Sequence, residues 1–501
     1  MASIVGIDLG TSYSVLASID EAGRPYVVRD DEGHNLVPSC VCLMNPDDKI
    51  VEVGEEAMRQ WGIPGATNVV ARFKRDMGTS KTYRLGDKEY SPIELSAFIL
   101  KKLVNISQKY LGPISKAVVT VPANFANEAR EGTMAAARMA GLDIEYIINE
   151  PTAAALYYAY RSGQELNGHY AVYDLGGGTF DISIIRAEGQ NIEVLCSNGV
   201  QKLGGDDFDE ALLKLVQRKY KDLVGTDLDL FHYNKTQAEE DKKSLSRKET
   251  IKVYANRNVI EVTRKEFEEA ISSKIAQAEM LCEAVLDEAG ITPDQIKKVF
   301  LAGGSTRVPI VMQSLMRVFG QEPQTDANVD EVVALGASLY AAYRTGKEDL
   351  NPAQRIVVES IALQEITAMN YGTVIYDESS TFQPNKTIND IIIKRNEQIP
   401  CSVTKSYYTV AKNQTGVLCR VTECLNDERD LRFTNTVFEE ELELPGGRPA
   451  GMEVKVTYEY TVNQMMYCTF LDVASGRTKK ASFSFASETS NDCDIDEFIV
   501  E

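Results

Sequence analysis

The sequence has few of the residues on which metal enzymes and nucleophilic enzymes usually rely. Its only histidines are His34, His169 and His232, which lie far apart in the chain. Three scattered histidines do not make a convincing zinc site or Ser-His-Asp triad, because both need several partners close together. The nine cysteines show no Cys-x-x-Cys spacing. Any catalysis is therefore left to carboxylates, lysine, hydroxyl groups and backbone amides.

Long apolar segments are missing as well. No run of transmembrane length occurs, and the first residues lead into a strand-like run without a basic start or a signal segment. We therefore expect a cytoplasmic protein whose scattered cysteines are reduced and mostly buried. The formal net charge of -21 argues against nucleic acid or an anionic membrane as a partner, because their phosphates would repel the chain.

Common phosphate-binding signatures are absent too. The sequence has no Gly-x-x-x-x-Gly-Lys-Ser/Thr loop, no His-Arg-Asp kinase loop and no Gly-x-Gly-x-x-Gly that opens a helix. It has instead a pair of matching turns, at residues 4–12 (IVGIDLGTS) and 170–181 (YAVYDLGGGTFD). Each is an apolar run that ends in an aspartate and turns through Leu-Gly into a threonine, with a second apolar run behind it. This pattern predicts two β-hairpins with glycine at the bend.

The two hairpins predict a site for phosphate and metal. Glycine at the bend lets backbone N–H groups approach a bound anion, and the preceding aspartate can hold a hydrated divalent cation on that anion. Asp8 and Asp174 lie 166 residues apart, which suggests two halves that clamp one nucleotide. From these residues alone, the clamp suits a kinase, a filament protein or an ATPase.

The length of the chain and the pattern of its residues indicate several domains. A chain of 501 residues is too long for one core, and two to four domains are expected. Over residues 1–345 strand-like runs alternate with helical ones, for example a helix at 92–110 and a strand at 116–122. This alternation is typical of layered α/β structure.

The last third of the sequence has a different pattern. Residues 346–360 are polar for most of their length and are expected to form an interdomain linker. Residues 361–486 alternate with period two between turn-forming residues, which predicts an antiparallel β domain. The acidic residues 487–501 are interpreted as a solvated tail.

Five separated blocks, found in order along the chain, carry a resemblance to a known family. They are residues 7–14 (IDLGTSYS), 119–125 (VTVPANF), 147–155 (IINEPTAAA), 173–181 (YDLGGGTFD) and 301–309 (LAGGSTRVP). The chain resembles the DnaK family of seventy-kilodalton heat-shock chaperones, strongly over residues 4–345 and more loosely over 356–486. The resemblance implies an α/β, actin-like (ribonuclease H-like) duplicated ATPase domain, followed by an antiparallel β-sandwich that binds peptide.

The resemblance also implies catalytic roles. Asp8 and Asp174 would position a hydrated Mg²⁺, with K⁺ as a further candidate ion, and Lys74 would orient the attacking water. Glu150 would hold the water or the metal shell from the other side, and Thr179 is a further catalytic candidate. A glutamate at the start of a helix is also favoured by the helix dipole alone, so a structural role for Glu150 stays open.

ATP would be held by residues from both halves. Glu239, Lys242 and Ser246 are spaced i, i+3, i+7 and so share one helix face, which suits adenosine recognition but is equally typical of a solvated charged surface. The further residues expected at ATP are Gly10, Thr11, Ser12, Tyr13, Gly176, Gly177, Gly178, Gly205, Gly303, Gly304, Ser305, Arg307 and Asp330.

Two residues match positions that couple ATP to peptide in the family, and two match positions that bind the peptide. Pro122 and Arg130 correspond to its proline switch and arginine relay, although a proline can simply end a strand. Residues 409–417 (TVAKNQTGV) resemble a strand and loop that cradle an extended peptide through main-chain hydrogen bonds and one apolar pocket. Val417 would form the pocket floor and Ala411 the covering arch, with core packing as the alternative for a valine in a strand.

The chain also departs from the family pattern. It stops at Glu501, where the family continues into a helical lid, so we expect a divergent, lidless or C-terminally truncated member with fast peptide exchange. The leucine-rich linker that ends in Asp in the family stands here as residues 356–359 (IVVE), and an arginine is replaced by Tyr146. Both positions help to dock the J-domain co-chaperone in the family, so that partnership is in doubt or uses an altered partner.

The resemblance favours a chaperone of the stress-response type over two alternatives. The expected activity is slow Mg²⁺-dependent hydrolysis of ATP that controls affinity for unfolded or extended client polypeptides, with a J-protein and a nucleotide exchange factor as further partners. An actin-like metabolite kinase would share the paired hairpins, because the clamp uses the same physics. A lidless regulatory binding module with little ATP turnover is the third hypothesis.

Overall fold

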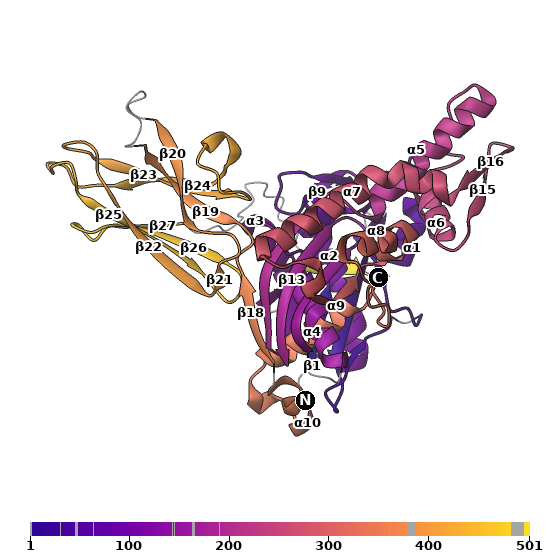
Figure 1. Cartoon of the computed structure of the whole chain (residues 1–501), viewed down its shortest axis with the longest axis horizontal. Coiled ribbons are helices and arrows are strands. Elements are labelled where there is room, and N and C mark those ends of the chain that lie inside the picture. The colour runs from indigo at the N-terminus through magenta and orange to yellow at the C-terminus, as the bar shows by residue number, and fades with distance from the viewer. Residues whose placement is uncertain are drawn as a thin grey trace. The chain divides into compact units, whose positions relative to one another are not determined.

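A computed structural model describes residues 3–30, 32–45, 49–63, 65–142, 144, 146–162, 166–189, 191–359, 361–377, 386–481 and 495–501. These residues form two compact units (Figure 1). The first unit takes in Met1–Asn124, Gly132–Leu363 and Asn491–Glu501, and the second takes in Phe125–Glu131 and Gln364–Ser490. No helix of the described residues is both long and apolar enough to cross a membrane.

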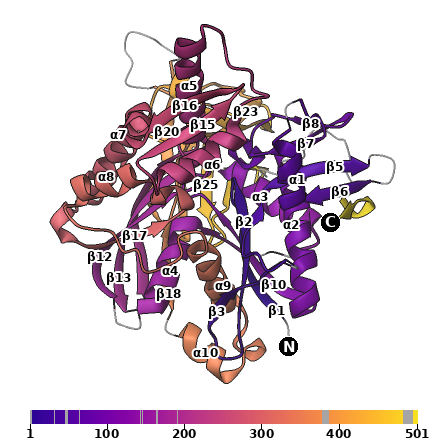
Figure 2. The ribbon, with the colours of Figure 1, turned by 90° about the vertical axis from the view of Figure 1, so that its right-hand side faces the viewer.

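The first sheet of the first unit begins with the first predicted hairpin. Strand β1 pairs antiparallel with β2, so that Asp8 lies opposite Val15, and pairs parallel with β10 on its other side. The strand order is β11-β10-β1-β2-β3, with β4 also paired to β2. Figure 2 labels β10, β1, β2 and β3 of this sheet. The bounds are β1 (Ser3–Asp8), β2 (Tyr13–Ile19), β3 (Pro25–Val27), β4 (Val37–Pro38), β10 (Ile114–Val121) and β11 (Tyr146–Asn149).

The second sheet repeats this arrangement around the second predicted hairpin. Strand β12 (Leu166–Leu175) pairs antiparallel with β13 (Phe180–Gly189) and parallel with β17 (Ile296–Ala302). Strand β14 (Asn191–Val200) continues the sheet beside β13. In both sheets, therefore, an antiparallel hairpin carries the aspartate and a parallel strand flanks the strand that ends in it. Both hairpins are confirmed, and so is the internal duplication at the level of strand pairing.

Helices α4 (Glu150–Ser162) and α9 (Val332–Arg344) approach each other at backbone distance. A Cβ on Gly336 of α9 would lie 1.7 Å from the carbonyl oxygen of Ala153 in α4. Helix α9 also lies against β1, because a Cβ on Gly6 would be 2.1 Å from the backbone nitrogen of Ser338. Glycine at both positions is thus required by close packing, since any side chain would push the elements apart.

Further helices cover the sheets of this unit. Helix α2 starts as its sequence predicts, because Ser91 accepts a hydrogen bond from the Glu94 amide and Glu94 bonds back to Ser91, a capping box. The helices are α1 (Glu55–Trp61), α2 (Pro92–Leu111), α5 (Gly205–Val224), α6 (Lys235–Leu245), α7 (Arg264–Ala289), α8 (Pro309–Phe319) and α10 (Pro352–Glu359), with α3 (Asn127–Met139) crossing the boundary of the two units. Short strands form the hairpins β8 (Tyr83–Leu85) with β9 (Lys88–Tyr90), and β15 (Thr250–Ala255) with β16 (Asn258–Thr263).

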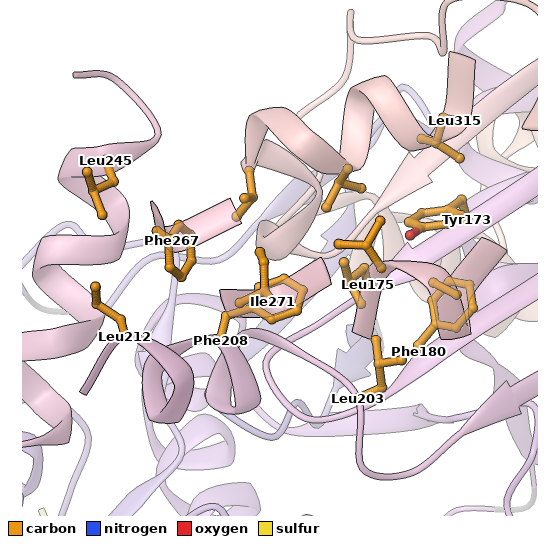
Figure 3. Packing of buried hydrophobic residues seen from close by; sticks show 14 of the residues in the cluster. Tyr173, Leu175, Phe180, Leu203, Phe208, Leu212, Leu245, Phe267, Ile271 and Leu315 are labelled. Carbon is orange, nitrogen blue, oxygen red and sulfur yellow. The ribbon is translucent and has the colours of Figure 1, made fainter. Parts of the chain in front are cut away.

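One large hydrophobic core packs against the strands of the second hairpin. Tyr173, Leu175 and Phe180 of β12 and β13 pack among buried side chains of α5 and α7, such as Phe208 and Ile271 (Figure 3). Burial of each such large apolar side chain contributes about 1.5–3 kcal/mol relative to exposure. Packing thus holds the strands on both sides of the turn between β12 and β13, and hydrogen bonds such as that from the Gly176 amide to the Thr179 carbonyl, 3.1 Å long, hold the turn itself.

A smaller sheet contains a strand that the sequence did not predict. Its order is β28-β6-β5-β7, with bounds β5 (Cys40–Asn45), β6 (Ile50–Val53), β7 (Val69–Ala71) and β28 (Ile499–Val500). The interpretation of residues 487–501 as a solvated tail is wrong for 495–501, because Ile495 and Val500 are buried and β28 pairs with β6. Residues 487–494 lie outside the described part. The only tryptophan of the sequence, Trp61, packs at the end of α1 against the small core of this sheet.

The predicted linker is partly helical. Residues 352–359 form α10, and Val358 of this helix is buried. The helix belongs to the first unit, where Val357 lies at the place that a Cβ on Gly23 would reach, 2.7 Å away. Polar composition indicated a linker and did not reveal this helix, in which Ile356 is exposed.

The second unit contains two antiparallel sheets of four strands each (Figure 1). The strand orders are β20-β19-β23-β24 and β22-β25-β26-β27, and one core of buried side chains draws on both sheets. The predicted period of two is visible in β22, where intermediate and exposed residues alternate. The bounds are β18 (Ala362–Ile366), β19 (Asn370–Tyr376), β20 (Thr387–Ile393), β21 (Gln398–Ile399), β22 (Cys401–Tyr408), β23 (Gly416–Cys424), β24 (Asn435–Glu443), β25 (Glu453–Tyr460), β26 (Met466–Asp472) and β27 (Thr478–Ala481).

The close contact of α4 and α9 generates a stability prediction. Gly336→Ala is expected to destabilise the first unit by about 1–3 kcal/mol, because the new methyl group would displace the backbone of α4. Gly446→Ala is the matched control, since a Cβ there meets no atom within 4 Å, and it should change stability by less than about 0.5 kcal/mol. Calorimetric unfolding of both variants measures the difference. Equal transition temperatures would show that the two helices are not packed at backbone distance.

Candidate functional site

The two hairpin turns meet at one place. A Cβ on Gly177, in the turn after β12, would lie 2.1 Å from the hydroxyl oxygen of Ser12, in the turn after β1. Gly10 is equally constrained, since its Cβ would lie 2.0 Å from the carbonyl oxygen of Tyr13. Small residues therefore allow the two turns to touch, and their backbone N–H groups lie at one site, where an anion can be bound.

Carboxylates cluster at the ends of the two strands. Asp8 accepts a hydrogen bond of 3.0 Å from the Thr120 hydroxyl, and Asp174 is buried at the equivalent position of β12. Burial, reinforced by the charge of Glu150, raises the pKa of Asp8 to about 7, although Lys74 opposes the shift. Burial and the nearby charges of Glu150, Asp181 and Asp8 raise the pKa of Asp174 well above its ordinary value. The site thus holds more negative charge than its own residues neutralise.

A buried ion pair lies beside these aspartates. Lys74 Nζ donates to Glu150 Oε1 at 2.6 Å, and both side chains are buried. Lys74 sits in the short 3₁₀ helix η1 (Phe73–Asp76), which directly follows edge strand β7. Glu150 is the first residue of α4, where the positive end of the helix dipole also favours a carboxylate. The lysine is therefore fixed at the cavity wall by a charge-assisted hydrogen bond.

The donor set fits a magnesium ion. Mg²⁺ prefers oxygen ligands, keeps several of its waters and is usually held by a few carboxylates together with phosphate oxygens. Asp8 and Asp174 supply carboxylates whose pKa values are raised by burial first and by neighbouring negative charges second. A divalent cation beside them would favour their ionised form. That these two residues hold the cation stays a prediction.

The opposite wall is formed by one face of α6. Glu239 and Lys242 are buried there, so the solvated-surface alternative for this face is wrong. Lys242 Nζ pairs with Asp209 at 2.6 Å and donates to the Gly205 carbonyl at 3.1 Å. Burial raises the pKa of Asp209 to about 6, against the opposing charge of Lys242. Arg72 reaches this wall as well and donates to Glu239 at 3.0 Å.

The turn after β17 closes the site from a third side. Gly303 has φ +81°, and a Cβ on it would lie 2.3 Å from the Leu175 carbonyl oxygen, so only glycine fits. Ser305 donates to the Gly176 carbonyl at 2.8 Å, which joins this turn to the second hairpin. Arg307 is held by Asp330 and by the Asn328 side chain, the latter at 3.0 Å. The turn is thus positioned by hydrogen bonds to the strand end beside it.

These walls enclose a cavity of ≈ 760 Å³. The predicted residues that line it are Asp8, Gly10, Thr11, Ser12, Tyr13, Lys74, Glu150, Asp174, Gly176, Gly177, Thr179, Gly205, Glu239, Lys242, Ser246, Gly303, Gly304, Ser305, Arg307 and Asp330. Gly178 does not line it, and a Cβ there would lie 2.6 Å from the Thr11 side chain, so this glycine serves turn packing. The cavity is of the size that small-molecule sites have.

Sequence reasoning missed several lining residues. Asp206, Asp209, Lys243, Arg247 and the apolar group Val15, Leu36, Val308, Val329 and Val333 also face the cavity. Lys243 lies 6.0 Å from the ring centre of Tyr13 and pairs with Glu239 at 3.2 Å. The signal for Lys243 was its place beside Lys242 on α6, but the apolar residues carry no motif. They became visible only when distant elements were brought together.

The two predicted coupling residues and the two predicted peptide-binding residues lie outside this cavity. Pro122 is buried directly after β10, and Arg130, in the second unit, donates to the Phe125 carbonyl at 2.9 Å and to the side chain of Gln464. Val417 in β23 is half-buried and packs against the core of the second unit, whereas Ala411 is exposed in the loop before that strand. Their functional roles stay predictions, and Val417 takes part in core packing as its alternative proposed.

Tyr146, the position that departs from the expected arginine, has a partner of its own. The guanidinium carbon of Arg344 in α9 lies 3.9 Å from the centre of the Tyr146 ring, which is cation–π geometry. The surface around β11 therefore differs in shape and charge from one that presents a free arginine. The doubt about a J-domain partner stays for this reason.

Comparison with known families finds a match that covers most of the chain. The family described as Hsp70 protein matches residues 4–84 and 79–501, so the two matched stretches together span nearly the whole sequence. The match covers the residues of both hairpin turns, the ion pair and the second unit. It agrees with the family that the five sequence blocks indicate.

The clustered carboxylates predict a pH dependence for the binding of Mg-ADP. The raised pKa means that Asp8 carries a proton below pH 7 in the free site, so proton and cation compete for it. Affinity for Mg-ADP should therefore rise by up to about tenfold from pH 6 to 7 and level off above that.

Calorimetric titration at several pH values measures this dependence. The control is ADP with a chelator, which keeps the protonation of the nucleotide itself but removes the cation. If affinity varied equally with pH in the presence and absence of Mg²⁺, the carboxylates would not be the cation ligands.

Proposed function

The chain belongs to the Hsp70 family, and from this premise we propose that it is a chaperone. It binds ATP together with Mg²⁺ and hydrolyses it slowly. This reaction controls its affinity for extended apolar segments of unfolded proteins. The single observation that carries the proposal is the buried Lys74–Glu150 pair, 2.6 Å long, which lines the same cavity as Asp8, Asp174 and both glycine turns. Positioning and charge neutralisation are what phosphoryl transfer demands of a protein.

Each residue at the cavity wall then has a defined task. Lys74 Nζ donates to Glu150 at the cavity wall, which places its ammonium group where it can orient a water and bind a phosphoryl oxygen. Asp8 and Asp174 would hold Mg²⁺ through its waters, and the cation would neutralise charge on the phosphates. The backbone amides of the two turns would bind phosphate oxygens without any need for further basic side chains.

Nucleoside recognition falls to the α6 wall and the turn after β17. Glu239 and Lys242 offer a fixed acceptor and a fixed donor, because each is held by an ion pair to a neighbour. Val15, Val308 and Val333 give the cavity apolar surface on which a purine ring can pack. A pocket of this kind, with apolar surface and a few fixed polar groups, suits a nucleotide better than a bare anion.

Membership of the Hsp70 family favours a chaperone over the metabolite kinase. The regulatory module with little ATP turnover stays open as a variant of the same function, because it would keep the cavity and lose only the hydrolysis. Clients, a J-domain co-chaperone and an exchange factor are proposed as partners on the strength of the family.

Substitution of the cavity lysine tests the role of hydrolysis. Lys74→Ala should lower the rate of ATP hydrolysis by about 10²–10³-fold, because a group that stabilises the developing charge is lost. Lys81→Ala is the matched control, because Lys81 lies seven positions after Lys74 and its side chain is mostly exposed. This variant should keep the parent rate. Steady-state phosphate release measures both variants, with Lys74→Gln as a second substitution that keeps a hydrogen-bond donor beside Glu150. A parent-like rate in Lys74→Ala would assign the water-orienting role elsewhere.

Nucleotide-dependent peptide binding tests the coupling. A fluorescent apolar peptide should bind the chain at least about fivefold more weakly with ATP than with ADP, which is the lower range of allosteric couplings. Fluorescence anisotropy measures both affinities, and the same peptide should raise the steady-state ATPase rate.

Two neighbouring substitutions in β23 provide the control. Val417→Phe should weaken the peptide, whereas Leu418→Phe, at an exposed position of the same strand, should not. Equal peptide affinity with ATP and with ADP would show that nucleotide and peptide binding are not coupled. Equal effects of the two substitutions would show that Val417 is not part of the peptide site.

A further inference from the structure

Residues 495–501 run along the edge strand β6 of the first unit. Ile499 and Val500 pair in parallel with Ile50 and Val51. The Ile499 amide donates to the Lys49 carbonyl at 3.0 Å, the Glu501 amide to the Val51 carbonyl at 2.9 Å, and the Val53 amide to the Glu501 carbonyl at 2.9 Å. Figure 2 shows this yellow segment at the C label, beside β5 and β6. The segment is therefore held by a strand ladder rather than by a chance contact.

Three side chains of the segment face the protein, one from the 3₁₀ helix η6 (Ile495–Glu497) and two from the residues that follow it. Ile495 is 2% exposed and Val500 9% exposed, whereas Ile499 between them is 55% exposed. The Phe498 ring packs edge-on against the buried Phe98 of α2, with ring centres 5.2 Å apart and planes at 79°. Such aromatic pairs are worth about 0.5–1.5 kcal/mol beyond the area that they bury. Three apolar anchors thus fix the register of the segment on the surface.

Polar contacts add selectivity. Asp496 accepts a hydrogen bond of 2.7 Å from Lys101, Glu497 pairs with Lys49, and the Asn105 side chain donates to the Val500 carbonyl at 3.3 Å. Phe98, Lys101 and Asn105 are spaced i, i+3, i+7 and so lie on one face of α2. This face therefore offers, in a row, a ring for Phe498, a charge for Asp496 and a donor for the backbone.

Strand β28 covers the edge of β6. In the order β28-β6-β5-β7, strand β6 would be the edge of the sheet without β28. An exposed edge presents unpaired N–H and C=O groups that invite another strand, and addition of an extended peptide to such an edge is a general mode of recognition.

We propose that residues 495–501 are a docking strand, with which this chain fastens the far end of its second unit to β6 and α2 of the first. The surface of β6 and α2 recognises the pattern Ile-Asp-Glu-Phe-Ile-Val through its anchors and its two lysines. The occupant is the chain's own segment, bound in cis. The proposal requires no assumption about ATP or peptide clients.

Docking returns the chain to the first unit after β27, by way of residues 482–494. Release of the segment would expose the β6 edge.

A competition experiment with the full chain tests the docking surface. A fluorescent synthetic peptide of residues 493–501 should bind poorly to the parent chain, because the tethered segment acts at an effective concentration near millimolar. The full-length double variant Ile495→Asp, Phe498→Asp should bind the same peptide at least about tenfold more tightly, since its own segment no longer competes. A peptide that itself carries Phe498→Asp is the matched control and should bind neither chain.

A charge exchange shows whether Lys101 contributes as the structure indicates. Lys101→Glu in the double variant should weaken the parent peptide, and a peptide with Asp496→Lys should restore part of the affinity to that chain alone. Lys109→Glu, near the end of the same helix and at an exposed position, is the control substitution. Equal affinity for both peptides in both chains would overturn the assignment of this contact.

Hydrogen exchange gives a readout that needs no peptide. The Val53 amide should exchange at least about tenfold faster in the full-length double variant than in the parent, because its acceptor is the Glu501 carbonyl. Amides of β11 should keep their rate, which shows that the unit stays folded. An unchanged rate at Val53 would overturn the proposal.

Two further outcomes also overturn it. Failure of the peptide to bind the double variant at millimolar concentration would show that the surface does not recognise the segment. Dimers of the parent that dissociate in the double variant, seen by light scattering, would assign the segment to a second copy and not to its own chain.

Discussion

A surplus of negative charge in a confined space is the constraint on which the first unit depends. Asp8, Asp174 and Glu150 face one cavity, and Lys74 neutralises only part of their charge through its contact with Glu150. Such a cluster is unfavourable in an empty protein, because burial and like charges both oppose ionisation. The two sheets, the turns between their strands and the contact of α4 with α9 hold these groups in place. The favourable packing of the whole unit thus offsets the unfavourable free energy of the clustered carboxylates.

The sequence predicted those parts of the fold and the site that local patterns encode. Both hairpins, the helix that begins at Pro92 and the alternation in the second unit follow from residues near one another, and the structure confirms them. Asp8, Lys74 and Glu239 could be brought to one site only through the family resemblance, because spacing alone cannot show which distant elements meet. The apolar lining at Val15 and Val333 was missed for the same reason. The domain boundaries and the roles of Pro122, Arg130 and Ala411 are still predictions.

Residues 346–360 and 495–501 contain structure that their average composition did not indicate. Both segments are polar for much of their length, and average composition favours solvated chain. In α10 Val358 is buried while Ile356 is exposed, and in residues 495–501 the side chains of Ile495, Phe498 and Val500 pack against the first unit. A strand of two residues cannot be recognised from period alone, because its stability comes from β6 and α2, which lie hundreds of positions earlier. Pairing between segments that are far apart in the chain thus cannot be predicted from a single sequence.

The position of Trp61 has a practical consequence for observing this molecule. It is the only tryptophan in the sequence, and it packs beside the small sheet whose outer edge is β28 and whose other edge strand, β7, leads into the 3₁₀ helix of Lys74. Intrinsic tryptophan emission from the entire chain therefore comes from a single lobe. It reports on events at either border of that sheet, and the rest of the protein contributes no background.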